Sequence, residues 1–116
     1  MNSGEDLEKE RLKRIVELND LLRTGYVGGK TLLTQGVNHL DDDLKHKILH
    51  AVQNFNDFTK DNDPYGEHDF GMVEMEGVKC YWKIDYYDNN LQYHSPDKSD
   101  PNVTQRVLTI MLAEEY

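Results

Sequence analysis

Cysteine is almost absent from this chain of 116 residues, and so are long hydrophobic runs. Its single cysteine, Cys80, excludes a disulfide framework and a cysteine-based zinc site, and it favours a reducing compartment. No apolar run approaches the ~18 residues that a membrane-spanning helix needs. The first residues, MNSGEDLEKERLKR, are charged and contain no apolar stretch of the kind found in a signal peptide. We therefore expect a cytoplasmic protein without a transmembrane segment.

Basic residues are also scarce. The chain has 13 basic and 22 acidic residues, a formal net charge of −9. Residues 57–116 hold thirteen of the acids and five of the bases, so nearly all of the excess lies in the second half. Proteins that bind nucleic acid or an anionic membrane directly need a basic face. We therefore expect neither ligand, whereas a cationic partner, a bound metal or simple solubility would each account for the charge.

The hydrophobic pattern of the first half predicts two helices and a strand. Leucine and isoleucine at helical spacing indicate an amphipathic helix over residues 5–23, after a capping box of Ser3 and Asp6. Residues 30–37 (KTLLTQGV) are rich in β-formers and predict a short strand. Three consecutive aspartates then begin a second helix, expected over residues 42–58.

The second half changes to a period of two. Val73 and Met75 alternate with glutamates, Glu76-Gly77 predicts a hairpin turn, and residues 78–87 predict the clearest strand of the chain. We expect a third meander strand at residues 91–94.

Asp100-Pro101 predicts the start of a C-terminal helix that reaches about Glu115. The expected fold is α+β, an antiparallel meander of three to four strands with helices packed on one face. Residues 5–116 would form this single domain, after a flexible N-terminus of residues 1–4.

A polar loop holds the densest group of chemically active side chains. Its six members are Asp57, Asp61, Asp63, Glu67, His68 and Asp69. Carboxylates on a flexible loop suit hard cations, so Mg²⁺, Ca²⁺ or Mn²⁺ could bind here. An EF-hand is excluded because Met72 stands where its bidentate glutamate is required. The alternative is a solvated turn in which aspartate and asparagine bond local backbone amides.

The strand at 78–87 has a second face, on which tyrosines alternate with charged side chains. That face carries Tyr81, Lys83, Asp85 and Tyr87, whereas Cys80 lies on the face with Trp82 and is expected to be buried. Tyrosines among charges are typical of protein-binding surfaces. Alternatively a helix covers this face too, and Lys83 and Asp85 act as a cross-strand support.

Four stretches resemble one family of small bacterial proteins, catalogued as domain of unknown function 3768. They are TGYVGGKTLLTQGV, NFNDFTKDNDPYGEHDFG, YWKIDYYD and DPNVTQRVLTIMLAEEY. The resemblance spans roughly residues 11–116. It implies a bacterial, plasmid or phage setting and a one-domain protein, and it brings no functional residues with it.

Two functions are consistent with these features. We favour a non-enzymatic acidic interaction protein without a cofactor, which binds a basic surface of a nucleic-acid-handling partner. Such a protein could be an inhibitor or anti-defence protein that mimics DNA, its carboxylates standing in for phosphates. The expected contacts are Asp57, Asp61, Asp63, Glu67, Asp69, Tyr81, Lys83, Asp85 and Tyr87.

The alternative is a metal-dependent hydrolase or nuclease. Its ligands would be Asp61, Asp63, Glu67, His68 and Asp69, with His68 or Lys83 assisting the reaction. The two functions differ in geometry, because metal ligands must converge on one point. The carboxylates of a mimic would instead point outward ~6–7 Å apart, near the spacing of phosphates along a nucleic-acid strand.

Overall fold

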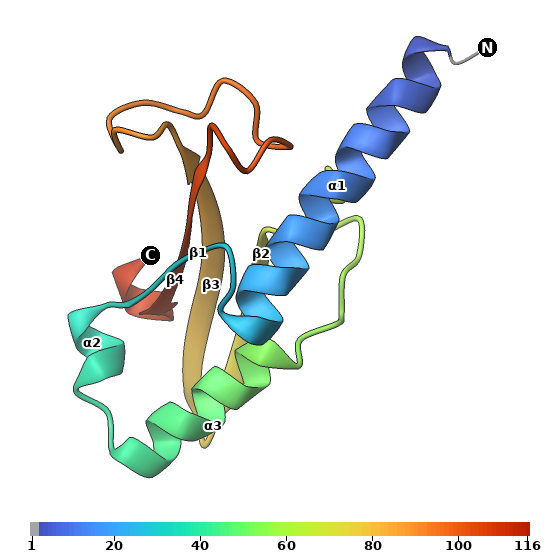
Figure 1. Cartoon of the computed structure of the whole chain (residues 1–116). Coiled ribbons are helices and arrows are strands. Elements are labelled where there is room, and N and C mark those ends of the chain that lie inside the picture. Colours follow the sequence, from blue (N-terminus) through green and yellow to red (C-terminus); the bar gives the residue numbers. More distant parts are fainter. Residues whose placement is uncertain (1–2) are drawn as a thin grey trace.

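The computed structural model describes residues 3–116. Four strands form one mixed sheet in the order β1-β4-β3-β2 (Figure 1). These strands are β1 (Gly29–Leu33), β2 (Phe70–Met75), β3 (Val78–Tyr87) and β4 (Gln105–Leu112). Strand β1 is parallel to β4, whereas β4 pairs antiparallel with β3 and β3 antiparallel with β2. The expected α+β class is confirmed, but the sheet is not purely antiparallel.

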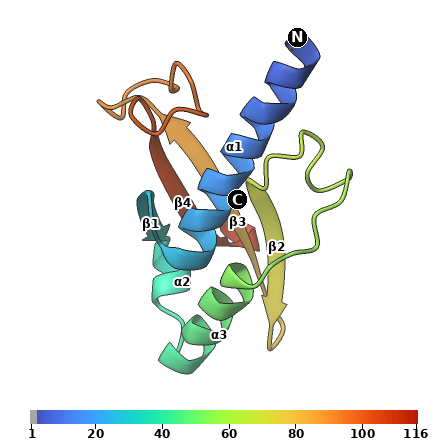
Figure 2. The same cartoon turned by 45° about the vertical axis from the view of Figure 1, so that its right-hand side comes forward.

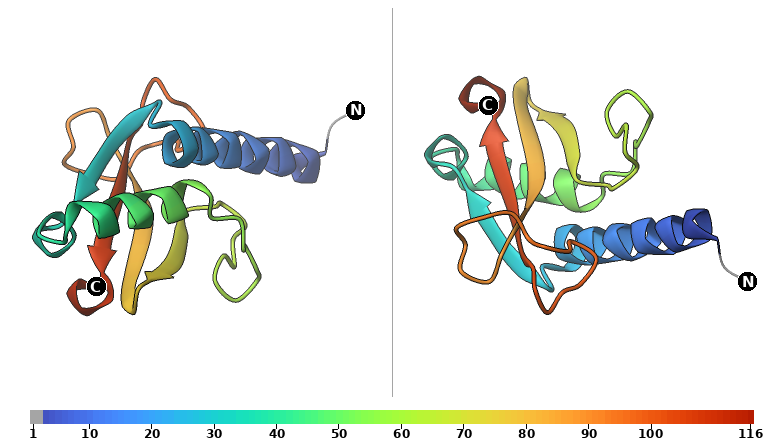
Figure 3. Two further views of the ribbon diagram at one scale, coloured as in Figure 1. Left: turned by 90° about the horizontal axis from the view of Figure 1, so that it is seen from below. Right: turned by 90° about the horizontal axis from the view of Figure 1, so that it is seen from above.

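Helix α1 (Gly4–Gly25) confirms the first predicted element. Ser3 accepts a hydrogen bond from the Asp6 amide and the Asp6 side chain accepts one from Ser3, which completes the capping box. Ser3 and Gly4 thus begin the helix, and the rest of the predicted flexible N-terminus falls outside the described residues. In both views of Figure 3, α1 extends well past the sheet.

The second predicted helix is shorter than expected. Helix α3 (Asp42–Gln53) ends before Phe55 and Phe58, which leave the helix and pack edge-on against Trp82. Arg23, buried near the end of α1, donates to the carbonyls of Val52 (3.0 Å), Gln53 (3.2 Å) and Phe55 (2.8 Å). This cation satisfies the carbonyls that the end of a helix leaves free.

The strand predicted at residues 30–37 also ends early. Thr34 follows β1 and begins a four-residue helix, α2 (Gln35–Asn38), by accepting a hydrogen bond from the Val37 amide. The hairpin of β2 and β3 forms as predicted. Its turn residues Glu76 and Gly77 have φ of 50° and 78°, the left-handed pair of a tight two-residue turn.

Two predictions for the C-terminal third are wrong. Residues 91–94 form no third meander strand, only an isolated bridge between Tyr87 and His94. Residues 101–115 form no α-helix. Pro101 lies in a turn, residues 105–112 form β4, and a 3-10 helix (Ala113–Glu115) follows. Residues 106–108, 110 and 111 are all buried, and a run that is apolar apart from Arg106 and Thr109 fits a central strand as well as a helix.

The core lies between one face of the sheet and the helices α1 and α3 (Figure 2). Trp82 is at its centre with no exposed surface, packed among residues such as Leu22, Ile48, Val52 and Leu108. Cys80 is buried on the same face, as expected. No helix within residues 3–116 combines the length and the apolar composition needed to cross a membrane.

Candidate functional site

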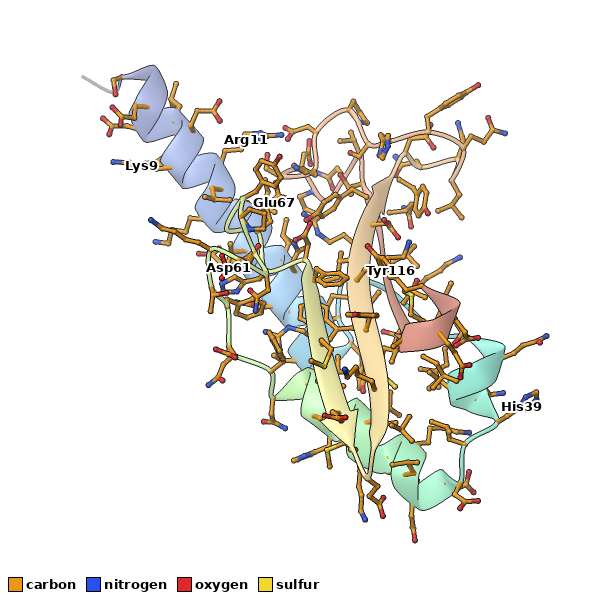
Figure 4. The ribbon with its side chains drawn as sticks, turned by 180° about the vertical axis from the view of Figure 1, so that it is seen from behind. Lys9, Arg11, His39, Asp61, Glu67 and Tyr116 are labelled. Atoms are coloured by element: carbon orange, nitrogen blue, oxygen red, sulfur yellow. The ribbon has the colours of Figure 1, made fainter. Side chains whose placement is uncertain are left out.

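The carboxylates of the acidic loop between α3 and β2 fall into an exposed group and a buried or half-buried group. Asp57 and Asp61 are exposed to solvent. Asp63 and Glu67 are only 7% and 9% exposed, and Asp69 is half-buried. Burial and the neighbouring carboxylates of Glu67 and Asp63 raise the pKa of Asp69. Figure 4 shows Asp61 and Glu67 in this loop beside α1.

Asp63 organises the loop from within. Its carboxylate oxygens accept hydrogen bonds from the backbone amides of Glu67 and His68, each at 3.1 Å. These bonds hold His68 at φ 58°, a left-handed conformation that is unfavourable for a residue other than glycine. The turn interpretation is therefore confirmed for Asp63, although its carboxylate is buried and not solvated.

His68 joins the loop to α1. Its ring stacks on Phe58, with centroids 3.8 Å apart and planes 5° from parallel. Its Nδ1 lies 3.0 Å from Oδ1 of Asp20, which also accepts a bond from Arg23 at 3.1 Å. These contacts hold the loop against α1.

Glu67 is the centre of a second polar network. Its carboxylate accepts from the Tyr86 hydroxyl at 2.9 Å and from the Lys98 ammonium at 2.5 Å. Asn19, which has no exposed surface, donates to the Glu67 carbonyl at 2.9 Å and to the Tyr86 hydroxyl at 2.8 Å. The Nε of Arg106 donates to the side-chain oxygen of Asn19 at 2.9 Å, and the Nη2 of Arg106 donates to the Lys98 carbonyl. Burial raises the pKa of Tyr86 well above its ordinary value.

Sequence reasoning missed most of this network. Asn19 carried a signal, since Ile15, Asn19 and Leu22 follow one another on the inward face of α1 and the middle residue is polar. A polar residue at an inward position requires buried partners. Nothing local to Lys98 or Arg106 indicates that these cations approach Glu67 and Asn19.

The network can position a loop, and each polar group in it already has a partner. Within residues 3–116, no three histidine, cysteine or acidic side chains are grouped so that they could bind one metal ion. The candidate metal ligands form hydrogen bonds with different partners instead. Asp63 bonds backbone amides, Glu67 bonds Lys98 and Tyr86, and His68 faces Asp20.

The remaining predicted residues lie on the other face of the sheet. Tyr81, Lys83, Asp85 and Tyr87 alternate with the buried residues of β3 and point away from α1 and α3, so these helices do not cover them. Lys83 lies 3.0 Å from Asp85 along the same strand, and this hydrogen bond raises the pKa of Lys83. The pair is therefore not a cross-strand support.

This surface, which we call the open face, is rich in aromatic side chains. Tyr81 packs against Phe70 at 5.4 Å and against Tyr116 at 5.1 Å between ring centroids, and Tyr116 is 74% exposed (Figure 4). Beside this cluster lies a shallow hollow of about 460 Å³, lined in part by Leu32 and Tyr87. Leu32 is itself 51% exposed.

Comparison with known proteins places most of this architecture in one family. The sequence model of a family described as Protein of unknown function (DUF3768) matches residues 33–115. No curated protein and no solved structure matches the chain. The match runs from the end of β1 through the acidic loop and β2–β4, and α1 lies outside it. The match thus begins later than the residue 11 expected from the sequence.

Proposed function

The chain belongs to the family of proteins of unknown function DUF3768, and we propose that it is a small, acidic, non-enzymatic protein-interaction module. The observation that carries this proposal is the open face of the sheet. Its tyrosines, its aliphatic side chains and its shallow hollow are not covered by α1 or α3. Side chains of this kind form the cores of protein interfaces, because large rings provide contact area at low entropic cost.

The net charge indicates what kind of partner the module binds. A formal charge of −9 on 116 residues attracts proteins with lysine- and arginine-rich surfaces and repels acidic ones. Two basic residues, Arg23 and Arg106, are buried, so they add little positive charge at the surface. Proteins that handle nucleic acids expose basic surfaces to bind phosphate. We therefore place the partner in that class, with this chain as its inhibitor or anti-defence antagonist.

Paired variants test the open face. Tyr81→Ala/Tyr87→Ala removes two rings from the open face, whereas Leu7→Ala/Leu21→Ala removes two exposed leucine side chains from α1 as the matched control. Each chain is immobilised and incubated with a bacterial lysate, and retained proteins are identified by mass spectrometry. Loss of buried aromatic anchors costs ~2 kcal/mol or more, about a thirtyfold loss of affinity.

We expect the wild type and the leucine variant to retain the same basic protein and the tyrosine variant to lose it. Purified partner, titrated against all three chains by calorimetry, then gives the affinities. Retention of the same proteins by all three chains would contradict a role for the open face. A partner with an acidic surface would contradict the charge argument.

A further inference from the structure

Strand β2 lies at an edge of the sheet (Figure 2). It pairs with β3 on one side, and within residues 3–116 no strand pairs with its other side. Many edge strands carry charged side chains, especially lysine, or proline, which discourage pairing with another chain. The residues of β2, FGMVEM, include neither lysine nor proline and only one charge, Glu74, whereas the opposite edge strand β1 includes Lys30.

The register identifies which backbone groups of β2 face outward. In an antiparallel pair, residues that exchange both hydrogen bonds alternate with residues whose backbone groups point away. The Ile84 amide donates to the Asp69 carbonyl at 2.9 Å, so the bonded positions of β2 continue at residues 71, 73 and 75. The amides and carbonyls of Phe70, Met72 and Glu74 therefore point to the free edge. Within residues 3–116, these amides and carbonyls have no backbone or side-chain partner on that edge. Met72 itself is 42% exposed.

The charge around this edge is strongly negative. Residues 57–76, which comprise the acidic loop, β2 and the first turn residue, contain seven acidic residues and a single base, Lys60. That is a formal charge of −6 out of the −9 of the whole chain. Glu74 and Glu76 are exposed at the end of the strand, and Asp57 and Asp61 are exposed in the loop before it.

We propose that the edge of β2 binds an extended, basic segment of a partner protein as a fifth strand of the sheet. The free amides and carbonyls of Phe70, Met72 and Glu74 supply the backbone pairing, as in other strand-addition complexes. Alternate side chains of the added strand extend the open face beside Met72, and basic side chains meet the surrounding carboxylates. This inference rests on the proposed function, since it specifies how the basic partner docks.

Met72→Pro tests the backbone pairing directly. Proline removes the amide hydrogen at the middle of the free edge, and it breaks no bond to β3 because that amide points outward. Met72→Thr is the matched control, since it also removes the methionine side chain but keeps the amide. The probe is a fluorescent peptide of about nine alternating lysines and valines, matched to the length of β2 plus its flanks. A second peptide of the same sequence carries N-methyl groups on all of its central residues, so it has the same charge but can pair along neither of its edges.

Fluorescence anisotropy should show binding of the first peptide to the wild type and to Met72→Thr with affinities within about threefold. Binding of this peptide to Met72→Pro, and of the methylated peptide to the wild type, should each be at least about tenfold weaker. Should Met72→Pro fail to fold, as judged by circular dichroism, the methylated peptide on the wild type still decides the question.

Equal binding of both peptides would overturn strand addition. If that binding is still lost in Tyr81→Ala/Tyr87→Ala, the proposed function stands and only the docking mode is wrong. Failure of the wild type to bind either peptide at low salt would overturn strand addition and, with it, the basic character of the partner.

Discussion

Asn19→Ala should destabilise the protein more than any ordinary loss of an asparagine. The side chain has no exposed surface and makes three hydrogen bonds, to the Glu67 carbonyl, the Tyr86 hydroxyl and the Arg106 guanidinium. The Tyr86 hydroxyl keeps its bond to the Glu67 carboxylate after the substitution. The Glu67 carbonyl and the Arg106 Nε lose a partner inside the protein.

The magnitude follows from these two unpaired groups. A buried polar group without a partner costs about 1–3 kcal/mol, and a charged one lies at the upper end. We therefore expect a loss of about 4 kcal/mol in the free energy of unfolding. With an m-value of about 2 kcal/mol/M, the urea midpoint would fall by about 2 M. The melting temperature would fall by roughly 15 °C for a domain of this size.

Fluorescence of the single tryptophan provides the assay. Trp82 has no exposed surface in the folded protein, so its emission shifts to the red on unfolding in a urea titration. The matched control is Asn89→Ala, which removes an exposed side chain that bonds Asn102 and Gln105. Water can replace those bonds, so its cost should stay within about 0.5 kcal/mol. A loss below about 1 kcal/mol for Asn19→Ala would refute the view that this network holds the acidic loop in place.

Three further predictions concern the core, the pH dependence and metal ions. Gly71→Ala should cost about 1–3 kcal/mol in the same urea titration, because a Cβ there would lie 2.5 Å from Trp82 Nε1, whereas an unchanged midpoint would mean that the ring moves freely. The pKa of Asp69 is raised in the folded protein, so its ionised form opposes folding at neutral pH and this cost disappears as the pH falls below the unfolded value. Asp69→Asn should therefore raise stability at pH 7 and much less at pH 4, and an equal effect at both pH values would contradict that pKa shift. Adding Mg²⁺, Ca²⁺ or Mn²⁺ to chelator-treated protein should leave the melting temperature unchanged, since the candidate ligands within residues 3–116 are not grouped at one point. A rise of about 10 °C at an ion concentration near 100 times its dissociation constant would instead favour the metal-dependent hydrolase or nuclease.

Short-range patterns in the sequence determined the elements whose signals are local. Helix α1 begins at the capping box of Ser3 and Asp6, and its bonds involve residues three or four positions apart. The hairpin of β2 and β3 follows from a two-residue turn at Glu76-Gly77 and a period-two alternation, which together also set its register. These features need no information from the rest of the chain.

The tertiary structure decided the conformation of residues 105–112 and which face of the sheet the helices cover. A largely buried segment in which apolar residues predominate can satisfy its backbone as a helix or as a strand, and only β1 on one side and β3 on the other make β4 a strand. The same non-local packing brings Lys98 and Arg106 to Glu67 and Asn19, and so takes Glu67 out of the group of free carboxylates. It also places both α1 and α3 on one face of the sheet, which leaves Tyr81 and Tyr87 on the open face. Sequence periodicity identifies which residues share a face, but what covers that face depends on contacts between segments far apart in the chain.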